Sequence, residues 1–254
     1  IKWQHSEKDF IDARGVCLRD GKIYFYSPKK FLAAIGTDGK PAWCKKSQGL
    51  LEAIAPHARA QHYITGYATT TYIKCSKDEI FFAGPTRPNL VCASAKDGRL
   101  LWLKKGGGNV QLVLREEGVF AAGAQRSNGG MILEYKTGKV KSEMPWRRAC
   151  TRATGSIDSV FFRAAGGTVR MDVPSNTAQH IAPMRPPCQD GVIISDGNLF
   201  WGPWMCGCQL SLYGHISLTA AGNQLASPGE ARAQFETGEG DLKNIRPLAA
   251  NKND

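Results

Sequence analysis

The residues of this sequence best suited to chemistry are four cysteines in its C-terminal half: Cys150, Cys188, Cys206 and Cys208. Thiolates at Cys-x-Cys spacing suit Cu(I) or zinc, so Cys206 and Cys208 could bind a metal with His215 as a further ligand. The same cysteines could instead form two disulfides or a redox-active pair. Two disulfides are the favoured interpretation, and the other two stay open.

The spacing around a predicted hairpin ranks the possible disulfides. Asp196-Gly197 is a residue pair that two-residue hairpin turns prefer, so residues whose numbers sum to about 393 should face each other. Cys188 then faces position 205, next to Cys206, and a small bulge would allow a bridge between them. Cys150 and Cys208 remain as the second pair, which would join two repeat units.

A second candidate site combines aromatic rings with arginines. Aromatic-rich patches are favoured at binding sites, and Gly and Pro residues around these rings interrupt the strand pattern. The arginines lie about one repeat upstream and could offer donors to an anion or carboxylate. The alternative is that the rings belong to the core and the arginines are solvated. The predicted patch consists of Trp201, Trp204, Tyr213, His215, Arg147, Arg148 and Arg152.

Charge and composition narrow the classes of partner. Lys and Arg exceed Asp and Glu by 33 − 22 = 11. The positive charges are scattered, and no basic stripe with interleaved aromatic residues is present, so we expect no nucleic-acid partner. No apolar run of about eighteen residues exists, so we expect no membrane span. Eight cysteines without zinc-finger spacing favour an oxidising compartment, periplasmic or otherwise extracytoplasmic.

Short apolar strands that follow polar turns recur along the chain, and they would position these sites. They are KIYFY at 22–26, EIFFA at 79–83, GVFAA at 118–122, SVFFR at 159–163 and NLFWG at 198–202. Their second residues are Ile23, Ile80, Val119, Val160 and Leu199, which gives steps of 57, 39, 41 and 39. Each strand is preceded by another extended run, so each unit begins with a hairpin.

A second hairpin follows in most units, with a polar turn and then a tryptophan. The clearest copies are Asp38-Gly39-Lys40 before Trp43 and Asp97-Gly98-Arg99 before Trp102. Each unit is therefore predicted to have four antiparallel strands. Radial stacking of such units buries both faces, which explains strands that are apolar at consecutive positions. The sequence thus predicts an all-β chain: a β-propeller with about five four-stranded blades, forming part of a larger propeller.

The first step is long, and the surplus lies in an inserted loop at 49–70. Leu50, Leu51 and Ile54 have near-helical spacing and predict a short helix there. Insertions in propellers fall in loops on one face, often the binding face. The propeller blades are assigned to residues 1–222 and a polar linker to 223–254, and the sequence is interpreted as a piece of a longer protein.

The turn between the third and fourth strands resembles the PQQ-type repeat of quinoprotein dehydrogenases and of outer-membrane assembly propellers. The matching copies are Asp38–Trp43, Asp97–Trp102 and a weaker Gly138–Trp146. The last third is most similar to a PQQ-like propeller group of planctomycete-type bacteria, through Arg148–Arg152, Pro186–Gly191 and Trp204–Cys208. The resemblance implies the propeller fold. It also implies PQQ as a possible cofactor. The sequence has no adjacent cysteine pair, and the Asp base and calcium ligands of quinoprotein dehydrogenases do not map onto particular residues of it.

These observations favour an exported bacterial PQQ-like propeller that acts as a binding or scaffolding module. Its partner would be a protein or a small molecule on the loop face, or the remainder of the same polypeptide, and no cofactor is required. The first alternative is the redox domain of a PQQ-dependent oxidoreductase. The second is a protein with a thiolate copper or zinc site. Whether the chain is an enzyme stays open.

Overall fold

A computed structural model describes residues 2–11, 15–54, 72–84, 87–107, 110–123, 129–148, 151–186, 191–203, 212 and 214–219. Contacts within the chain divide it into two compact units, Ile1–Leu218 and Thr219–Asp254. Thr219 is the one described residue of the second unit. The predicted boundary between residues 222 and 223 lies outside the described residues, and the fold below is that of the first unit.

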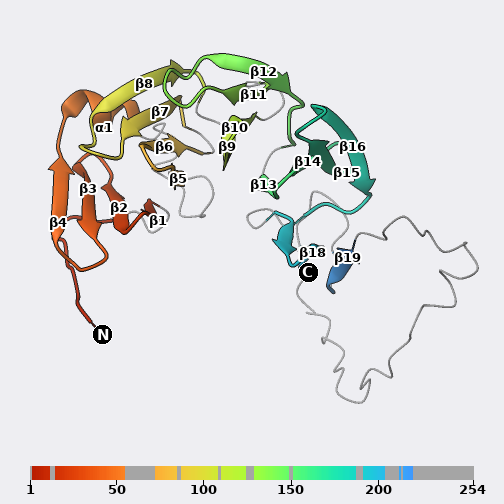
Figure 1. Cartoon of the computed structure of the whole chain (residues 1–254), viewed down its shortest axis with the longest axis horizontal. Helices are drawn as coiled ribbons and strands as arrows, with labels where there is room; N and C mark the ends of the chain where they lie inside the picture. The colour runs from red at the N-terminus through yellow and green to blue at the C-terminus, as the bar shows by residue number, and fades with distance from the viewer. Residues whose placement is uncertain are drawn as a thin grey trace, which may run out of the picture. The chain divides into compact units, whose positions relative to one another are not determined.

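The described chain forms five antiparallel sheets that follow one another in sequence order (Figure 1). Within each sheet the strands also lie in chain order, and four sheets have four strands while the fifth has three among the described residues. Blade 1 comprises β1 (Val16–Arg19), β2 (Lys22–Ser27), β3 (Phe31–Gly36) and β4 (Pro41–Lys45); blade 2 comprises β5 (Tyr72–Cys75), β6 (Glu79–Ala83), β7 (Asn89–Ser94) and β8 (Leu100–Lys105). Blade 3 comprises β9 (Val110–Arg115), β10 (Gly118–Gly123), β11 (Gly130–Leu133) and β12 (Val140–Met144); blade 4 comprises β13 (Thr154–Gly155), β14 (Ser159–Ala164), β15 (Gly167–Asp172) and β16 (Thr177–Ala182); blade 5 comprises β17 (Ile193–Ser195), β18 (Asn198–Trp201) and β19 (Ile216–Thr219).

Asp-Gly turns set the register of the first hairpin in blades 1 and 5. Asp20 and Gly21 have φ of 48° and 72°, and Asp196 and Gly197 have φ of 48° and 74°. Two consecutive residues with positive φ match the twist of a tight hairpin, and Asp and Gly tolerate that conformation. Ile193 therefore faces Phe200, and the predicted sum of 393 is confirmed for the described part of this hairpin.

In blades 2, 3 and 4, consecutive residues of the second strand face opposite neighbouring blades. In blade 2, Ile80 packs in the cluster shared with blade 1, whereas Phe81 packs in the cluster shared with blade 3. In blade 3, Val119 and Phe120 divide in the same way between blades 2 and 4. Apolar residues at consecutive positions are thus buried on both faces of a sheet.

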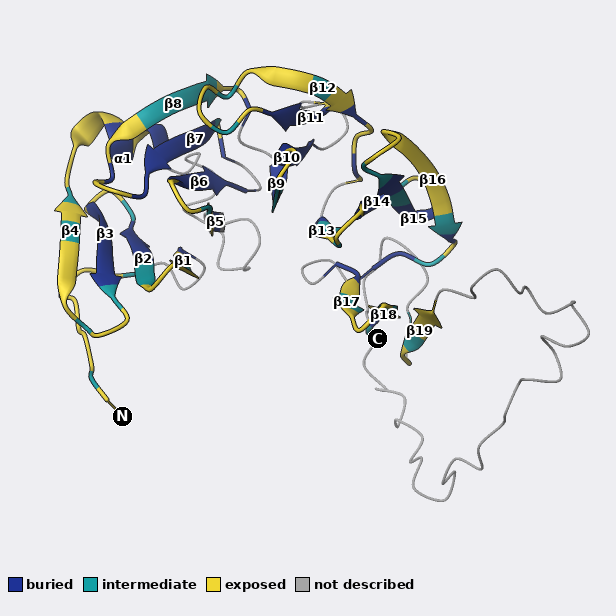
Figure 2. Ribbon diagram, in the orientation of Figure 1, coloured by how far each residue is buried: buried dark blue, intermediate teal, exposed yellow. Residues whose placement is uncertain are grey.

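The core lies between neighbouring sheets, as Figure 2 shows by the buried middle strands. The first strands form the inner edge, where β1 contacts β5 and β5 contacts β9. The fourth strands β4, β12 and β16 are largely exposed, and β8 is mostly half-buried. None of the clusters of the described residues joins blade 1 to blade 5; the other face of blade 1, with Phe25 and Phe31, is instead covered by Trp3 and Ile11.

Tryptophans connect the outer parts of neighbouring blades. Trp43 of β4 donates from Nε1 to the carbonyl of Ala95 at 3.2 Å, and Trp102 of β8 donates to the carbonyl of Tyr135 at 2.7 Å. Each ring covers a turn glycine of the next blade, Gly98 and Gly138 respectively, where a Cβ atom would lie 2.6–2.7 Å from the ring. Through these contacts, the tryptophan of each of these two turns packs its blade on the next.

The weaker copy of the turn pattern, Gly138–Trp146, does not bury its tryptophan to the same extent, because Trp146 is 37% exposed.

The predicted short helix is confirmed as α1 (Gln48–Ile54), which buries Leu50 and Leu51 and packs on β7. The rest of the insertion, residues 55–70, lies outside the described residues. The predicted all-β propeller with four-stranded antiparallel blades is confirmed.

Candidate functional site

The four cysteines of the predicted disulfides lie outside the described residues, as do Trp204 and Tyr213. The pairing of Cys188 with Cys206 and of Cys150 with Cys208 therefore stays a prediction, as does the metal site of Cys206, Cys208 and His215. Among the residues that the structure does describe, no group of three or more His, Cys, Asp or Glu side chains is placed to hold a metal.

The described members of the predicted aromatic and arginine patch do not lie in one place. Trp201 is fully buried between blades 4 and 5, and its Nε1 donates to Thr168 Oγ1 at 3.0 Å. Arg147 is also buried, and its Nε donates to the carbonyl of Ala122 at 2.7 Å. Trp201 therefore connects blades 4 and 5, whereas Arg147 is bonded to β10 of blade 3, the blade whose last strand it follows.

Two other members are exposed, and a third lies at the inner edge of the blades. Arg148 and His215 are exposed. Arg152 is half-buried and lines a recess beside the first strands. The patch as a whole stays a prediction, and Arg152 is the member that the structure brings next to other side chains suited to binding.

Two cysteines of neighbouring blades meet at this inner edge. Cys17 of β1 and Cys75 of β5 are both half-buried free thiols, and both pack against the cluster between blades 1 and 2. A hydrogen bond between their thiols is the largest influence on the pKa of each. The structure thus brings these two cysteines onto facing sides of neighbouring sheets.

The reason is a one-residue difference in register. Cys17 pairs with Tyr24, which faces blade 2, whereas Cys75 pairs with Ile80, which faces blade 1. Residues directly opposite in a sheet lie on the same face. The two thiols therefore project toward each other, which would not follow from truly equivalent positions.

The surroundings of the pair divide the two thiols into a donor and an acceptor. The hydrogen bond from Cys17 lowers the pKa of Cys75, helped by the positive charges of Arg19 and Lys74 and opposed by burial and Asp20. The same hydrogen bond, followed by burial and the charge of Cys75, raises the pKa of Cys17. Cys75 is thus the thiol that the site favours as a thiolate.

Lys74 and Arg152 bring positive charge to the same recess. Surrounding protein and the nearby Arg152 guanidinium lower the pKa of Lys74. The Lys74 side chain is nevertheless exposed to solvent, because it lies in an open recess that is surrounded by protein. Like charges held together in this way favour an anion between them.

The recess itself has a volume of about 550 Å³ and spans the first strands of several blades. Arg19, Lys74 and Arg152 supply its cations, from blade 1, blade 2 and the segment before β13. Leu112, Leu114, Val192 and Ile193 supply apolar walls. None of the described residues that line it carries a carboxylate.

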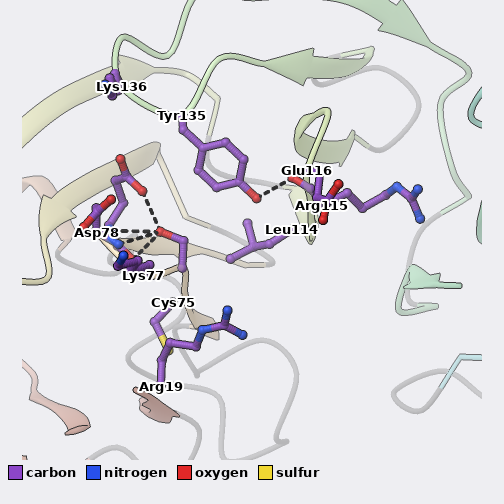
Figure 3. A pocket seen from close by; sticks show the side chains of 11 residues that line it. Arg19, Cys75, Lys77, Asp78, Leu114, Arg115, Glu116, Tyr135 and Lys136 are labelled. Atoms are coloured by element: carbon purple, nitrogen blue, oxygen red, sulfur yellow. Dashed lines mark hydrogen bonds between the residues drawn. The ribbon is translucent and has the colours of Figure 1, made fainter. Parts of the chain in front are cut away.

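A second recess, of about 460 Å³, adjoins the first and shares Arg19, Cys75 and Leu114 with it. Figure 3 shows Cys75 beside Arg19 on one side and Tyr135 on the other, where the Tyr135 hydroxyl donates to the carbonyl of Arg115 at 2.8 Å. Burial raises the pKa of Tyr135 to about 12, so its hydroxyl stays protonated at neutral pH. Cys75 is therefore accessible from two recesses.

Sequence reasoning missed Arg19, Lys74, Cys17 and Cys75 as a group because no local motif joins them. The available signal was the alternation of faces in the repeat. Aligning each first strand on its hairpin partner, rather than on its position in the unit, would have shown that Cys17 and Cys75 face each other.

The chain matches no protein-family model and no curated protein sequence. Among solved structures it is similar to BamB from Moraxella catarrhalis, with 14% identity over 78% of this chain and 60% of that one, and a TM-score of 0.49. It is also similar to two computationally designed proteins: Ika8, with 8% identity over 74% of this chain and 54% of that one and a TM-score of 0.49, and Ika4, with 9% identity over 68% and 91% and a TM-score of 0.43. The chain thus spans 60% of the BamB structure, and its propeller fold rests on its own sheets and their packing. No helix of the described residues is long and apolar enough to cross a membrane.

Proposed function

We propose that this chain is a binding module whose inner-edge recess takes an acidic segment of a protein partner. The observation that carries this proposal is the convergence of Arg19, Lys74 and Arg152, from three parts of the chain, on one recess whose described lining has no carboxylate. Burial and then the charge of Arg152 lower the pKa of Lys74, and a ligand carboxylate would offset both. The recess should therefore bind a carboxylate ligand more tightly than a single exposed lysine would.

The walls of the recess favour a peptide over a small inorganic anion. Leu112, Leu114, Val192 and Ile193 are apolar and lie beside the cations. Burial of apolar side chains adds to the attraction of charges, and open recesses with both features suit extended segments. A peptide that alternates acidic and apolar residues would satisfy both parts of the lining.

The proposal includes an extracytoplasmic, PQQ-like propeller of bacterial origin. The eight cysteines support an oxidising compartment. The repeated turn with its docked tryptophan, seen at Gly98 and Gly138, supports the PQQ-like repeat. Fractionation of the native host tests the compartment: recovery with periplasmic or secreted proteins is expected, and recovery with cytoplasmic markers would contradict it.

The binding proposal is tested with a fluorescein-labelled peptide of alternating glutamate and leucine, by fluorescence anisotropy on the full chain. The double variant Lys74→Ala/Arg152→Ala should weaken binding by about 3- to 10-fold, the range expected for losing partly exposed charge pairs. The matched control is Lys40→Ala/Lys139→Ala, which removes the same charge from exposed turns between third and fourth strands. Equal losses in both variants, or no binding by the wild type, would contradict a specific site.

A further inference from the structure

The thiol pair at the inner edge has three features that a surface cysteine lacks. Cys17 and Cys75 come from contacting first strands of different blades and pack against the same cluster, and each is the largest influence on the pKa of the other. Both are free thiols. Cys75 also lines both recesses, so a reagent can approach its sulfur from solvent.

We propose that Cys17 and Cys75 are a reversible dithiol–disulfide pair, in which Cys75 attacks a disulfide substrate and Cys17 completes the bridge. This inference rests on the inner-edge geometry and goes beyond the proposed binding function. The adjoining strands β1 and β5 bring the two cysteines onto facing sides of neighbouring sheets. The oxidant is a small-molecule disulfide or a disulfide of another protein.

The step is a thiol–disulfide exchange. The Cys75 thiolate attacks one sulfur of the disulfide RSSR, which forms a Cys75–SR mixed disulfide and releases RS⁻. The Cys17 thiol then loses its proton and attacks the Cys75 sulfur, which forms the Cys17–Cys75 bond and releases the second RS⁻. Both leaving groups take up the two protons of the protein thiols, so two RSH form and two electrons pass from the protein to RSSR.

Positive charge near Cys75 favours the first attack. Arg19 and Lys74 both stabilise the thiolate, and Cys17 donates its S–H to it. The charge of Asp20 opposes them by raising the pKa of Cys75. Burial and then the charges of Cys75 and Cys17 raise the pKa of the neighbouring Tyr24. Cys44 on β4 is exposed but has no thiol neighbour among the described cysteines, so it provides an internal reference.

The bridge would connect the first strands of blades 1 and 2 and enclose residues 18–74, which include α1 and the insertion. A cross-link over a loop of this length stabilises a folded chain mainly by constraining the unfolded one. Formation of the Cys17–Cys75 bridge is therefore expected to raise Tm by about 5–10 °C. Cys17→Ser cannot form this bridge and should lose that increase on oxidation.

The test equilibrates the fully reduced full chain with mixtures of reduced and oxidised glutathione, traps free thiols by alkylation, and maps every cysteine by mass spectrometry. In the wild type we expect a peptide cross-link between Cys17 and Cys75. In Cys17→Ser trapped at early times, we expect the glutathione adduct to form at Cys75 about tenfold faster than at Cys44. The mapping assigns each bridge to its residues, so the other cysteines of the chain do not confuse the result.

Two outcomes would overturn the proposal: a wild type in which Cys75 keeps a stable glutathione adduct without a Cys17 cross-link, or one in which Cys75 and Cys44 react equally. Both outcomes are measured on the wild-type protein, so the test stays decisive even if a variant misfolds. The binding proposal is tested separately, since Lys74→Ala/Arg152→Ala retains both cysteines and its peptide affinity is measured in the reduced protein.

Discussion

At the scale of single residues, Cys75 differs from the other described cysteines in the groups around its thiol. Its neighbours donate a hydrogen bond and bring positive charge, whereas burial raises the pKa of Cys92. Both cysteines belong to strands, β5 and β7, yet their thiols therefore have opposite chemistry. The difference arises from the side chains that face each thiol across the gap between sheets.

The first prediction concerns alkylation of Cys75 by iodoacetamide as a function of pH. The rate at Cys75 should reach half of its plateau at a lower pH than that of a free cysteine derivative, because Cys17, Arg19 and Lys74 outweigh burial and Asp20. Cys17→Ala should shift this midpoint upward, since it removes the largest influence. Mass spectrometry of each modified peptide gives the rates.

Cys92 provides the negative control for this measurement. Burial raises its pKa, and no reaction is expected until the chain unfolds. A Cys75 midpoint at or above that of the free derivative would show that the charges around it do not stabilise the thiolate.

At the scale of elements, two turn glycines allow the cost of a clash with a docked tryptophan to be separated from the cost of backbone strain. Gly138 and Gly197 have similar positive φ, 67° and 74°. A Cβ at Gly138 would lie 2.7 Å from the Trp102 ring, whereas nothing lies within 4 Å at Gly197. The same substitution at both positions therefore separates the two costs.

The second prediction compares Gly138→Ala with Gly197→Ala in urea unfolding. Gly197→Ala should destabilise by about 1 kcal/mol, the cost of a left-handed alanine. Gly138→Ala should cost about 1–3 kcal/mol more, because the Trp102 ring must move. Equal losses at the two glycines would mean that the tryptophan contact contributes nothing to stability.

The third prediction concerns the turn between β15 and β16. Ser175 donates from Oγ to Asp172 Oδ2 at 2.6 Å, and this bond, with the Ser175 backbone N–H and Arg170, lowers the pKa of Asp172. A carboxyl whose folded pKa lies below its unfolded value of about 3.9 stabilises the protein above that pH, and the effect is lost as pH falls through the folded pKa. In Ser175→Ala, the free energy of unfolding should therefore decrease less than in the wild type as the pH falls from about 5 to about 2.

Urea midpoints measured across this pH range test the third prediction, with Ser195→Ala on the exposed part of β17 as the control. The control should keep the wild-type pH dependence. An unchanged pH dependence in Ser175→Ala would show that its hydroxyl does not stabilise the Asp172 carboxylate.

The elements themselves were largely predictable from the sequence because their signals are local. Asp196-Gly197 fixes a two-residue turn, and its register extends along the hairpin. Gly98 and Gly138 follow from the repeated turn pattern. The inner-edge site was not predictable in the same way, because Cys17, Lys74 and Arg152 meet only once neighbouring blades are packed.

At the scale of the molecule, the packing of one sheet on the next creates a site that no single blade contains. Blade 1 supplies Arg19 and Cys17, blade 2 supplies Lys74 and Cys75, and the chain before β13 supplies Arg152. Chain segments far apart in sequence therefore define the recess. Its integrity should depend on blade packing as much as on the lining residues.

The fourth prediction separates the binding module from the PQQ-dependent oxidoreductase implied by the repeat resemblance. The full-length protein, purified from its native host, should show no absorption band above that of its aromatic residues and should gain none on addition of PQQ with calcium. A quinone band that co-purifies with the protein would favour the oxidoreductase instead.

Photo-cross-linking tests most directly the central claim that the inner edge is the binding surface. The glutamate–leucine peptide would carry a benzophenone, and cross-linked residues would be mapped by mass spectrometry on the full chain. We predict cross-links concentrated in residues 74–75, 112–114, 152–155 and 192–194, which line the recess. Cross-links concentrated on the exposed outer strands β4, β8 and β12, where lysines are also present, would contradict the account.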